Sequence, residues 1–168
     1  MQTETLLDLW RKLRQESVLA LEEFPGEALD EELIPGFMNF RTLHRHILDS
    51  THVLTGLLLD GATEFNKPEV RAQFPKHLPV IEENAGAQAI AEALSARMEE
   101  RISQLAVQPA EFWDREVVHF TGARMSAFEM MLMIQRHESE HRAQAALLSR
   151  MKGIVPATTR RRLAAQAR

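Results

Sequence analysis

The sequence contains no cysteine among its 168 residues. This absence excludes disulfides, thiolate metal ligands and a cysteine nucleophile, so any metal ion must be bound by histidines and carboxylates. No apolar run approaches the roughly 18 residues that a membrane helix needs. The stretch MQTETLLDLWRK also lacks the basic start and apolar core of a signal peptide. We therefore expect a cytoplasmic protein that does not enter a membrane.

Basic residues are too few and too scattered to form a nucleic-acid-binding surface. The net charge is -4 and the isoelectric point is about 6.0. The basic cluster of Arg160, Arg161, Arg162 and Arg168 has no aromatic partners, so we interpret it as a solvated tail. A chain of this length, 45% hydrophobic and 26% charged, is most simply one domain. We expect that domain to cover residues 1–156, followed by a basic tail over 157–168.

Alternation of apolar and polar residues, which would predict strands, nowhere extends convincingly over a strand's length. Four segments instead repeat apolar residues every three or four positions, as an amphipathic helix does. These segments predict helices over about 3–23, 39–60, 85–106 and 127–152. Four long helices with long connections describe an all-α fold, a four-helix bundle with long crossover loops.

Capping residues mark the ends of two of the predicted helices. Asn39 is a suitable N-cap, and Gly61 suits a left-handed cap at the other end of the same helix. Ser126 with Glu129 three residues later predicts a capping box at the start of the last helix, and Gly153 marks its end. The last helix is therefore the best specified element.

Two connections are long enough to take part in a site. Residues 61–83 hold three prolines and scattered charges, which predicts a crossover loop with at most a short helical turn, forming a site wall or lid. The stretch EFWDREVVHFTG, residues 111–122, is aromatic and β-branched, so we expect it to be extended. In the tail, Thr158 or Thr159 can start a short terminal helix.

The stretch RHESEHRAQ, residues 136–144, contains both His-Glu-x-x-His and His-x-x-Glu-His, the signatures of two classes of zinc peptidase. The first class takes a third ligand downstream, but no His, Asp or Glu follows His141. Glu138 also lies about 100° around the helix from His137, so we expect it to face solvent or a helix edge. We therefore disfavour a peptidase and interpret Glu138 and Glu140 as solvated charges.

The two histidines of this stretch lie one helical turn apart on the apolar stripe of the last helix. This spacing brings two imidazoles onto one cation. The alternative is a buried, hydrogen-bonded pair without a metal. Such a pair would find only Gln144 as a polar partner on the stripe, at a cost of roughly 1–3 kcal/mol for each unpaired group. The pattern therefore favours a metal site at His137 and His141.

A third protein ligand must come from upstream, and the predicted second helix offers three histidines. His46 shares a face with apolar residues of the stripe and is preferred. His44 lies on the flank of the stripe and stays in contention as the reserve, whereas His52 points away and is interpreted as a surface residue. His77 and His119 are interpreted as incidental, with the alternative that either lines a wall of the site.

Two stretches resemble the DinB-like, or YfiT-like, metal-binding four-helix bundles. HILDSTHVLTGLLLDG, residues 46–61, is similar to that family's second helix, which opens with a metal histidine. GARMSAFEMMLMIQRHESEHRAQAALLSRMKGIVP, residues 122–156, is similar to its last helix, with Ala143 where the family commonly has Gly. The resemblance implies that His46, His137 and His141 bind one divalent ion, usually zinc, nickel or iron in this family. Histidine ligation alone does not distinguish these metals.

The resemblance also implies a function. Family members include S-transferases and isomerases that use low-molecular-weight thiols, and homodimers are common among them. We therefore expect a homodimer and a metal-dependent transferase acting on a small-molecule thiol and an electrophile. The alternative is a non-catalytic, metal-binding stress-response protein. A third interpretation is a bundle without metal whose function is a protein contact.

Overall fold

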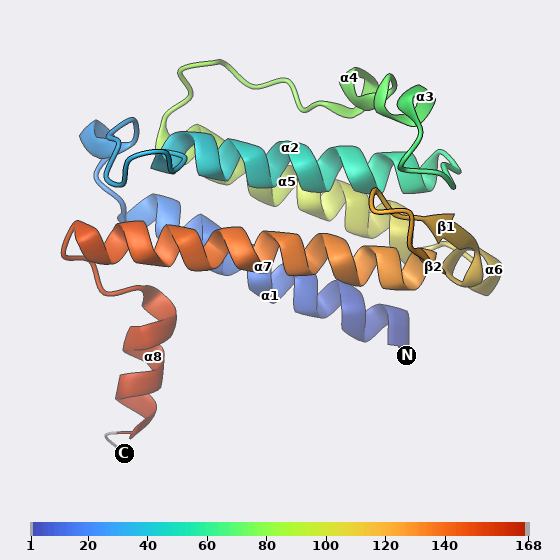
Figure 1. The fold of residues 1–168 in the computed structure, drawn as a ribbon. Coiled ribbons are helices and arrows are strands. Elements are labelled where there is room, and N and C mark those ends of the chain that lie inside the picture. Colours follow the sequence, from blue (N-terminus) through green and yellow to red (C-terminus); the bar gives the residue numbers. More distant parts are fainter. Residues whose placement is uncertain (1, 167–168) are drawn as a thin grey trace.

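Four long helices pack into a bundle in the computed structural model, which describes residues 2–166 (Figure 1). Helices α1 and α2 each pack against α5 and α7, so α1 and α2 face each other across one diagonal of the bundle. This arrangement confirms the predicted four-helix bundle. The four helices are α1 (Gln2–Glu23), α2 (Phe40–Leu59), α5 (Ala87–Ala106) and α7 (Ala127–Met151).

The ends of α2 and α7 follow from the capping residues in the sequence. The Asn39 side chain accepts a hydrogen bond from the backbone N–H of Thr42 at 2.8 Å. Ser126 and Glu129 form the predicted capping box, in which each side chain accepts from the other residue's backbone N–H. Gly61 and Gly153 have φ of 90° and 76°, which favours glycine at the turn after each helix.

The connections hold more local structure than the sequence indicated. A 3-10 turn, η1 (Gly26–Ala28), follows α1, and the crossover after α2 contains the short helices α3 (Pro68–Arg71) and α4 (Phe74–His77). The expectation that residues 111–122 are extended is wrong for their first part, which belongs to α6 (Ala110–Asp114). Phe112 and Trp113 are buried there against the bundle, and this packing outweighs their preference for a strand.

A small antiparallel hairpin follows α6 and leads into α7. Its strands are β1 (Glu116–Val118) and β2 (Arg124–Ser126), with Val117 opposite Met125. Val118 also bridges to Glu64 of the crossover, so the hairpin and the crossover lie together at one end of α2 (Figure 1). The chain ends in α8 (Ala157–Gln166), which has no buried residue and extends away from the bundle (Figure 1).

Buried apolar residues form two clusters along the bundle axis, and a buried polar layer separates them. The first cluster centres on Trp10, Leu57 and Ile134, and the second on Leu21, Ile47 and Leu94. Between the two clusters, each of α1, α2 and α7 contributes polar side chains to the interior. The buried polar residues of this layer are Arg14, Ser17, Thr51 and Glu138.

Among residues 2–166, no helix is long and apolar enough to cross a bilayer.

Candidate metal centre

The structure brings His46 of α2 together with His137 and His141 of α7. One ring nitrogen from each histidine lies within 4.8 Å of the other two. The Nε2 atoms of His46 and His137 are 3.0 Å apart, and the three rings meet edge to face. Because His137 and His141 are one turn apart on α7, the helix itself sets their separation. The three histidines selected from the sequence therefore form one cluster.

The geometry of this cluster fits a divalent ion. Two nitrogens that each lie about 2.0–2.1 Å from a tetrahedral ion are roughly 3.3 Å apart, close to the His46–His137 separation. Without an ion, only one of these two nitrogens can donate a hydrogen to the other, whereas a cation accepts lone pairs from both. Three histidine ligands leave a coordination position open, which is typical of catalytic rather than structural zinc sites.

Burial and neighbouring histidines favour the neutral, metal-binding form of His46 and His137. Burial lowers the pKa of His46, and His141 lowers it further. The pKa of His137 is lowered by burial and then by the two other histidines. Nδ1 of His141 lies 2.9 Å from Oε1 of Gln144, so Nδ1 carries the proton and Nε2 is free to bind a cation. Gln144, the polar partner that the stripe offered in the sequence, thus orients His141.

The other two histidines of α2 lie outside the cluster. His44, the reserve ligand, is fully buried and its Nδ1 donates to the Phe40 carbonyl at 2.9 Å. His52 was expected at the surface, and that prediction is wrong because only 8% of the residue is exposed. Arg101 of α5 reaches across and donates to Nε2 of His52 at 3.0 Å, so this nitrogen has a partner without a metal.

The prediction that Glu138 faces solvent is also wrong. Glu138 is fully buried and accepts hydrogen bonds from Nε of Arg14 at 2.6 Å, Nη2 of Arg14 at 2.9 Å and Nε1 of Trp10 at 2.7 Å. Both carboxylate oxygens are therefore occupied inside the bundle. Glu138 cannot serve as the general base that a His-Glu-x-x-His peptidase requires. Glu140, in contrast, is exposed and pairs with Arg136, as expected of a solvated charge.

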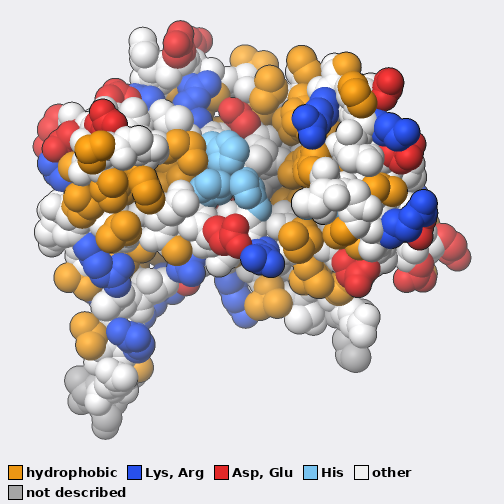
Figure 2. Space-filling model, in the orientation of Figure 1, with side chains coloured by type: hydrophobic (Ala, Val, Ile, Leu, Met, Phe, Trp, Pro, Cys, Tyr) orange, Lys and Arg blue, Asp and Glu red, His pale blue; other side chains and the backbone are white. Residues whose placement is uncertain are grey.

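A cavity of about 560 Å³ opens beside the histidines. His46 and His137 line it, and both long connections complete its walls, as the sequence predicted. The crossover contributes Phe74 and Leu78, and the hairpin contributes His119 and Phe120. Figure 2 shows histidine side chains gathered at the middle of this face, with hydrophobic side chains on both sides of them. A small molecule in the cavity would therefore lie against the candidate metal site.

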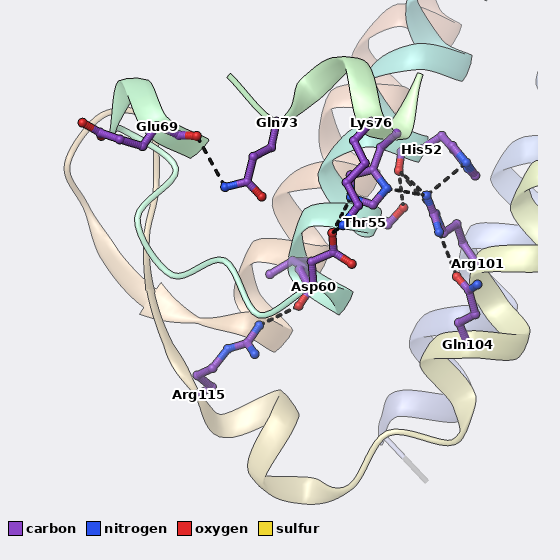
Figure 3. Close-up of polar contacts among 11 residues, drawn as sticks. His52, Thr55, Asp60, Glu69, Gln73, Lys76, Arg101, Gln104 and Arg115 are labelled. Carbon is purple, nitrogen blue, oxygen red and sulfur yellow. Dashed lines mark hydrogen bonds and ion pairs between the residues drawn. The ribbon is translucent and has the colours of Figure 1, made fainter. Parts of the chain in front are cut away.

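Polar contacts fix the crossover wall onto α2 and α5 (Figure 3). Nη2 of Arg101 donates to Nδ1 of His77 at 3.3 Å, so the proton of His77 is on Nε2, which donates to Asp60 at 2.8 Å. Lys76 also pairs with Asp60, and Lys76 and then His77 lower the pKa of that carboxyl. His77 does not itself line the cavity, but its hydrogen bonds anchor α4 beside it, whereas His119 lines the cavity.

Close packing at Gly56 permits this arrangement. A Cβ atom at residue 56 would lie 2.4 Å from Nδ1 of His77 and 2.6 Å from Nη2 of Arg101. Arg115, between α6 and β1, donates from Nη2 to the Leu58 carbonyl at 2.8 Å (Figure 3). The end of α2 thus holds both the crossover and the segment that leads into the hairpin.

The sequence analysis missed Asp49, which lies one turn after His46 and lines the cavity. Burial raises the pKa of its carboxyl, and Arg45 one turn earlier lowers it in part. A spacing of three residues from the preferred metal ligand was the signal available in the sequence. It also missed the Arg14–Glu138 pair, because the partners are 124 residues apart.

Comparisons with known proteins agree with the fold. The model of the DinB family matches residues 1–167. The crystal structure of a DinB-like protein, YjoA from Bacillus subtilis, superimposes with a TM-score of 0.67 at 15% sequence identity, covering 89% of this chain and 92% of that one. No curated protein matches the chain. At this identity the structural likeness concerns the fold, while the family model covers nearly the whole sequence. The chain belongs to the DinB family.

Proposed function

We propose that His46, His137 and His141 bind one divalent ion and that the site catalyses transfer of a low-molecular-weight thiol to an electrophile. The observation that carries the proposal is the convergence of three imidazole nitrogens within 4.8 Å beside a cavity of about 560 Å³. Zinc, nickel and iron all accept histidine ligands, so the donor set admits each of them.

A divalent ion with an open position supplies one chemical property, a lowered pKa of the thiol or water that it binds. The protein's own residues supply the rest. His46 and His137 present their Nε2 atoms side by side, and Gln144 holds the third imidazole in the tautomer with Nε2 free. The cavity next to them excludes water from an apolar substrate and holds it in place for reaction. The chain has no cysteine, so the thiol comes from the cosubstrate.

A non-catalytic metal-binding role is the second candidate. It is favoured by the same cluster, because three histidines can retain an ion whether or not a substrate binds. The two functions differ in one requirement, since a transferase needs both the metal and the cavity.

Conjugation of a thiol to an electrophilic aromatic halide by the metal-loaded protein tests the proposal. We expect turnover that disappears in His137→Ala and after removal of the metal by a chelator, and that falls when Met133→Trp fills part of the cavity. Met133 lines the cavity and is not among the three histidines. Full metal binding with no turnover for any common low-molecular-weight thiol would instead support the binding role.

A further inference from the structure

We infer that the cavity selects an apolar molecule that carries a protonated amine or a comparable hydrogen-bond donor, and that the Asp49 carboxylate receives this group. The identification of this molecule as the acceptor substrate rests on the proposed function, because both concern the same site. The preference for a cationic apolar ligand is a property of the cavity and can be measured separately from transferase activity.

The walls of the cavity predict an apolar ligand body. Aliphatic and thioether side chains come from α2 and α7, and aromatic rings come from the crossover and the hairpin. A volume of about 560 Å³ is within the usual range for pockets that bind small molecules. The apolar lining residues include Val53, Leu54, Phe74, Phe120, Met130 and Met133.

In the metal-free protein, the side-chain charges at the cavity favour a cation over an anion. Arg136 is the cationic lining residue, and its Nε donates to Glu140 at 2.9 Å, so this charge is already compensated. His46 and His137 also line the cavity, but they belong to the metal site and serve it as neutral imidazoles. The charge left over at the lining is the carboxylate of Asp49.

Asp49 is available to a ligand. Within residues 2–166, no side chain forms a hydrogen bond or an ion pair with its carboxylate, and Arg45 acts on it only through its charge. Arg45, the nearest cation on the same helix face, instead donates to the backbone carbonyls of Glu82 and Glu83. A half-buried carboxylate without a direct partner gains from a cationic or donor group that enters the cavity.

His119 of the hairpin offers a second polar group at the lining. The backbone N–H of Thr121 donates to Nδ1 of His119 at 3.3 Å, so neutral His119 carries its proton on Nε2. A hydrogen-bond donor there suits a hydroxyl or carbonyl oxygen on the ligand, whereas Asp49 takes the donor or cation. The two groups therefore suit different polar groups of a ligand.

Calorimetric titration with three probes of the same chain length tests this inference. Octylammonium, 1-octanol and octanesulfonate are each titrated into the metal-loaded full-length protein and into the chelator-treated protein. We expect octylammonium to bind the chelator-treated protein about tenfold more tightly than octanesulfonate, with octanol in between. In both forms, Asp49→Asn should weaken octylammonium about tenfold and change octanol less than twofold. Asp114→Asn, at an exposed position outside the cavity, is the matched control and should change neither.

The inference would be overturned by octanesulfonate binding as tightly as octylammonium to the chelator-treated protein, or by an unchanged octylammonium affinity in Asp49→Asn. Failure of all three probes to bind would also overturn it. Metal content, measured on the same samples, separates this result from the proposed function. A protein that shows the amine preference but binds no metal would support the cavity's selectivity and contradict the metal-dependent transferase.

Discussion

Arg14 of α1 and Glu138 of α7 form a fully buried ion pair at the level of the candidate metal centre. All three guanidinium nitrogens of Arg14 have partners, since Arg14 also donates to the hydroxyl of Thr51 at 2.7 Å and to the Leu94 carbonyl at 3.2 Å. Glu138 directly follows His137 in the sequence, so the pair connects α1, α2 and α5 to the turn of α7 that carries the histidines. We expect it to fix the rotation of α7 and thereby the direction of both histidines.

Removal of one partner should destabilise the protein strongly. Arg14→Met and Glu138→Leu each leave an uncompensated buried charge, which costs about 3–5 kcal/mol of unfolding free energy. The double variant Arg14→Met/Glu138→Leu replaces both charges by apolar groups. Its free energy of unfolding should be much closer to that of the wild type than the value of either single variant. Urea denaturation of the three variants measures this difference. A double variant whose loss equals the sum of the two single losses would contradict an interaction between the partners.

Gly56→Ala should detach the crossover wall from α2. The added methyl group meets His77 and Arg101, and overpacking of this kind costs about 1–3 kcal/mol. We expect faster proteolysis within residues 61–83 and weaker binding of apolar ligands. Metal binding should be retained, because the added methyl group does not contact His46, His137 or His141. Gly86→Ala is the control, since no atom lies within 4 Å of a Cβ built at that residue. Equal proteolysis of the two variants would show that His77 does not hold the wall.

Acid should destabilise the fold partly through His44. Burial lowers the pKa of His44 to about 4, whereas an unfolded histidine has its ordinary value near 6.5. Between these values the unfolded chain binds more protons than the folded one, so stability is full above pH 6.5 and falls as the pH drops toward 4. The loss from this residue is on the order of 3 kcal/mol.

The variant His44→Leu isolates this contribution. It removes the titrating group, so its unfolding free energy should change less than that of the wild type between pH 6.5 and pH 4. Denaturant titrations at several pH values within this range provide the comparison. Parallel curves for the two proteins would mean that His44 does not carry the effect.

Gln144→Leu should weaken metal binding without removing a ligand. Without the hydrogen bond from Nδ1 to Gln144, neither the orientation nor the tautomer of the His141 ring is fixed. Loss of such a partner reduces metal affinity by about 10–100-fold. Gln135→Leu on the same helix is the matched control, because the Gln135 amide donates to the Leu6 carbonyl at 2.9 Å instead. Competition titrations with a chelating dye give both affinities. A similar affinity for the two variants would argue against the role of Gln144.

The sequence predicted the long helices well because their signals are local. Asn39, Gly61 and the Ser126–Glu129 capping box determine helix ends through contacts within a few residues, and apolar periodicity determines the buried face. The proximity of the three histidines followed from the same periodicity together with the family resemblance. These features need no knowledge of which helices are neighbours.

Features that depend on distant partners were not predictable in the same way. By their spacing, Glu138 and His52 fall away from the apolar stripes of their helices. Arg14 and Arg101 nevertheless reach them from other helices and donate hydrogen bonds to them in the interior. Phe112 and Trp113 favour strands by type, but packing against the bundle places them in α6. In each case a tertiary contact outweighed the local pattern.

The most direct test of the account is the metal content of the purified protein and of three single variants, measured by elemental analysis. We expect about one divalent ion per chain in the wild type and in the control His44→Leu, and loss of the ion in His46→Ala, His137→Ala and His141→Ala. Circular dichroism confirms that each variant is folded. Full retention of the metal in all three alanine variants, or its absence from a wild type supplied with zinc, nickel and iron, would contradict the histidine site.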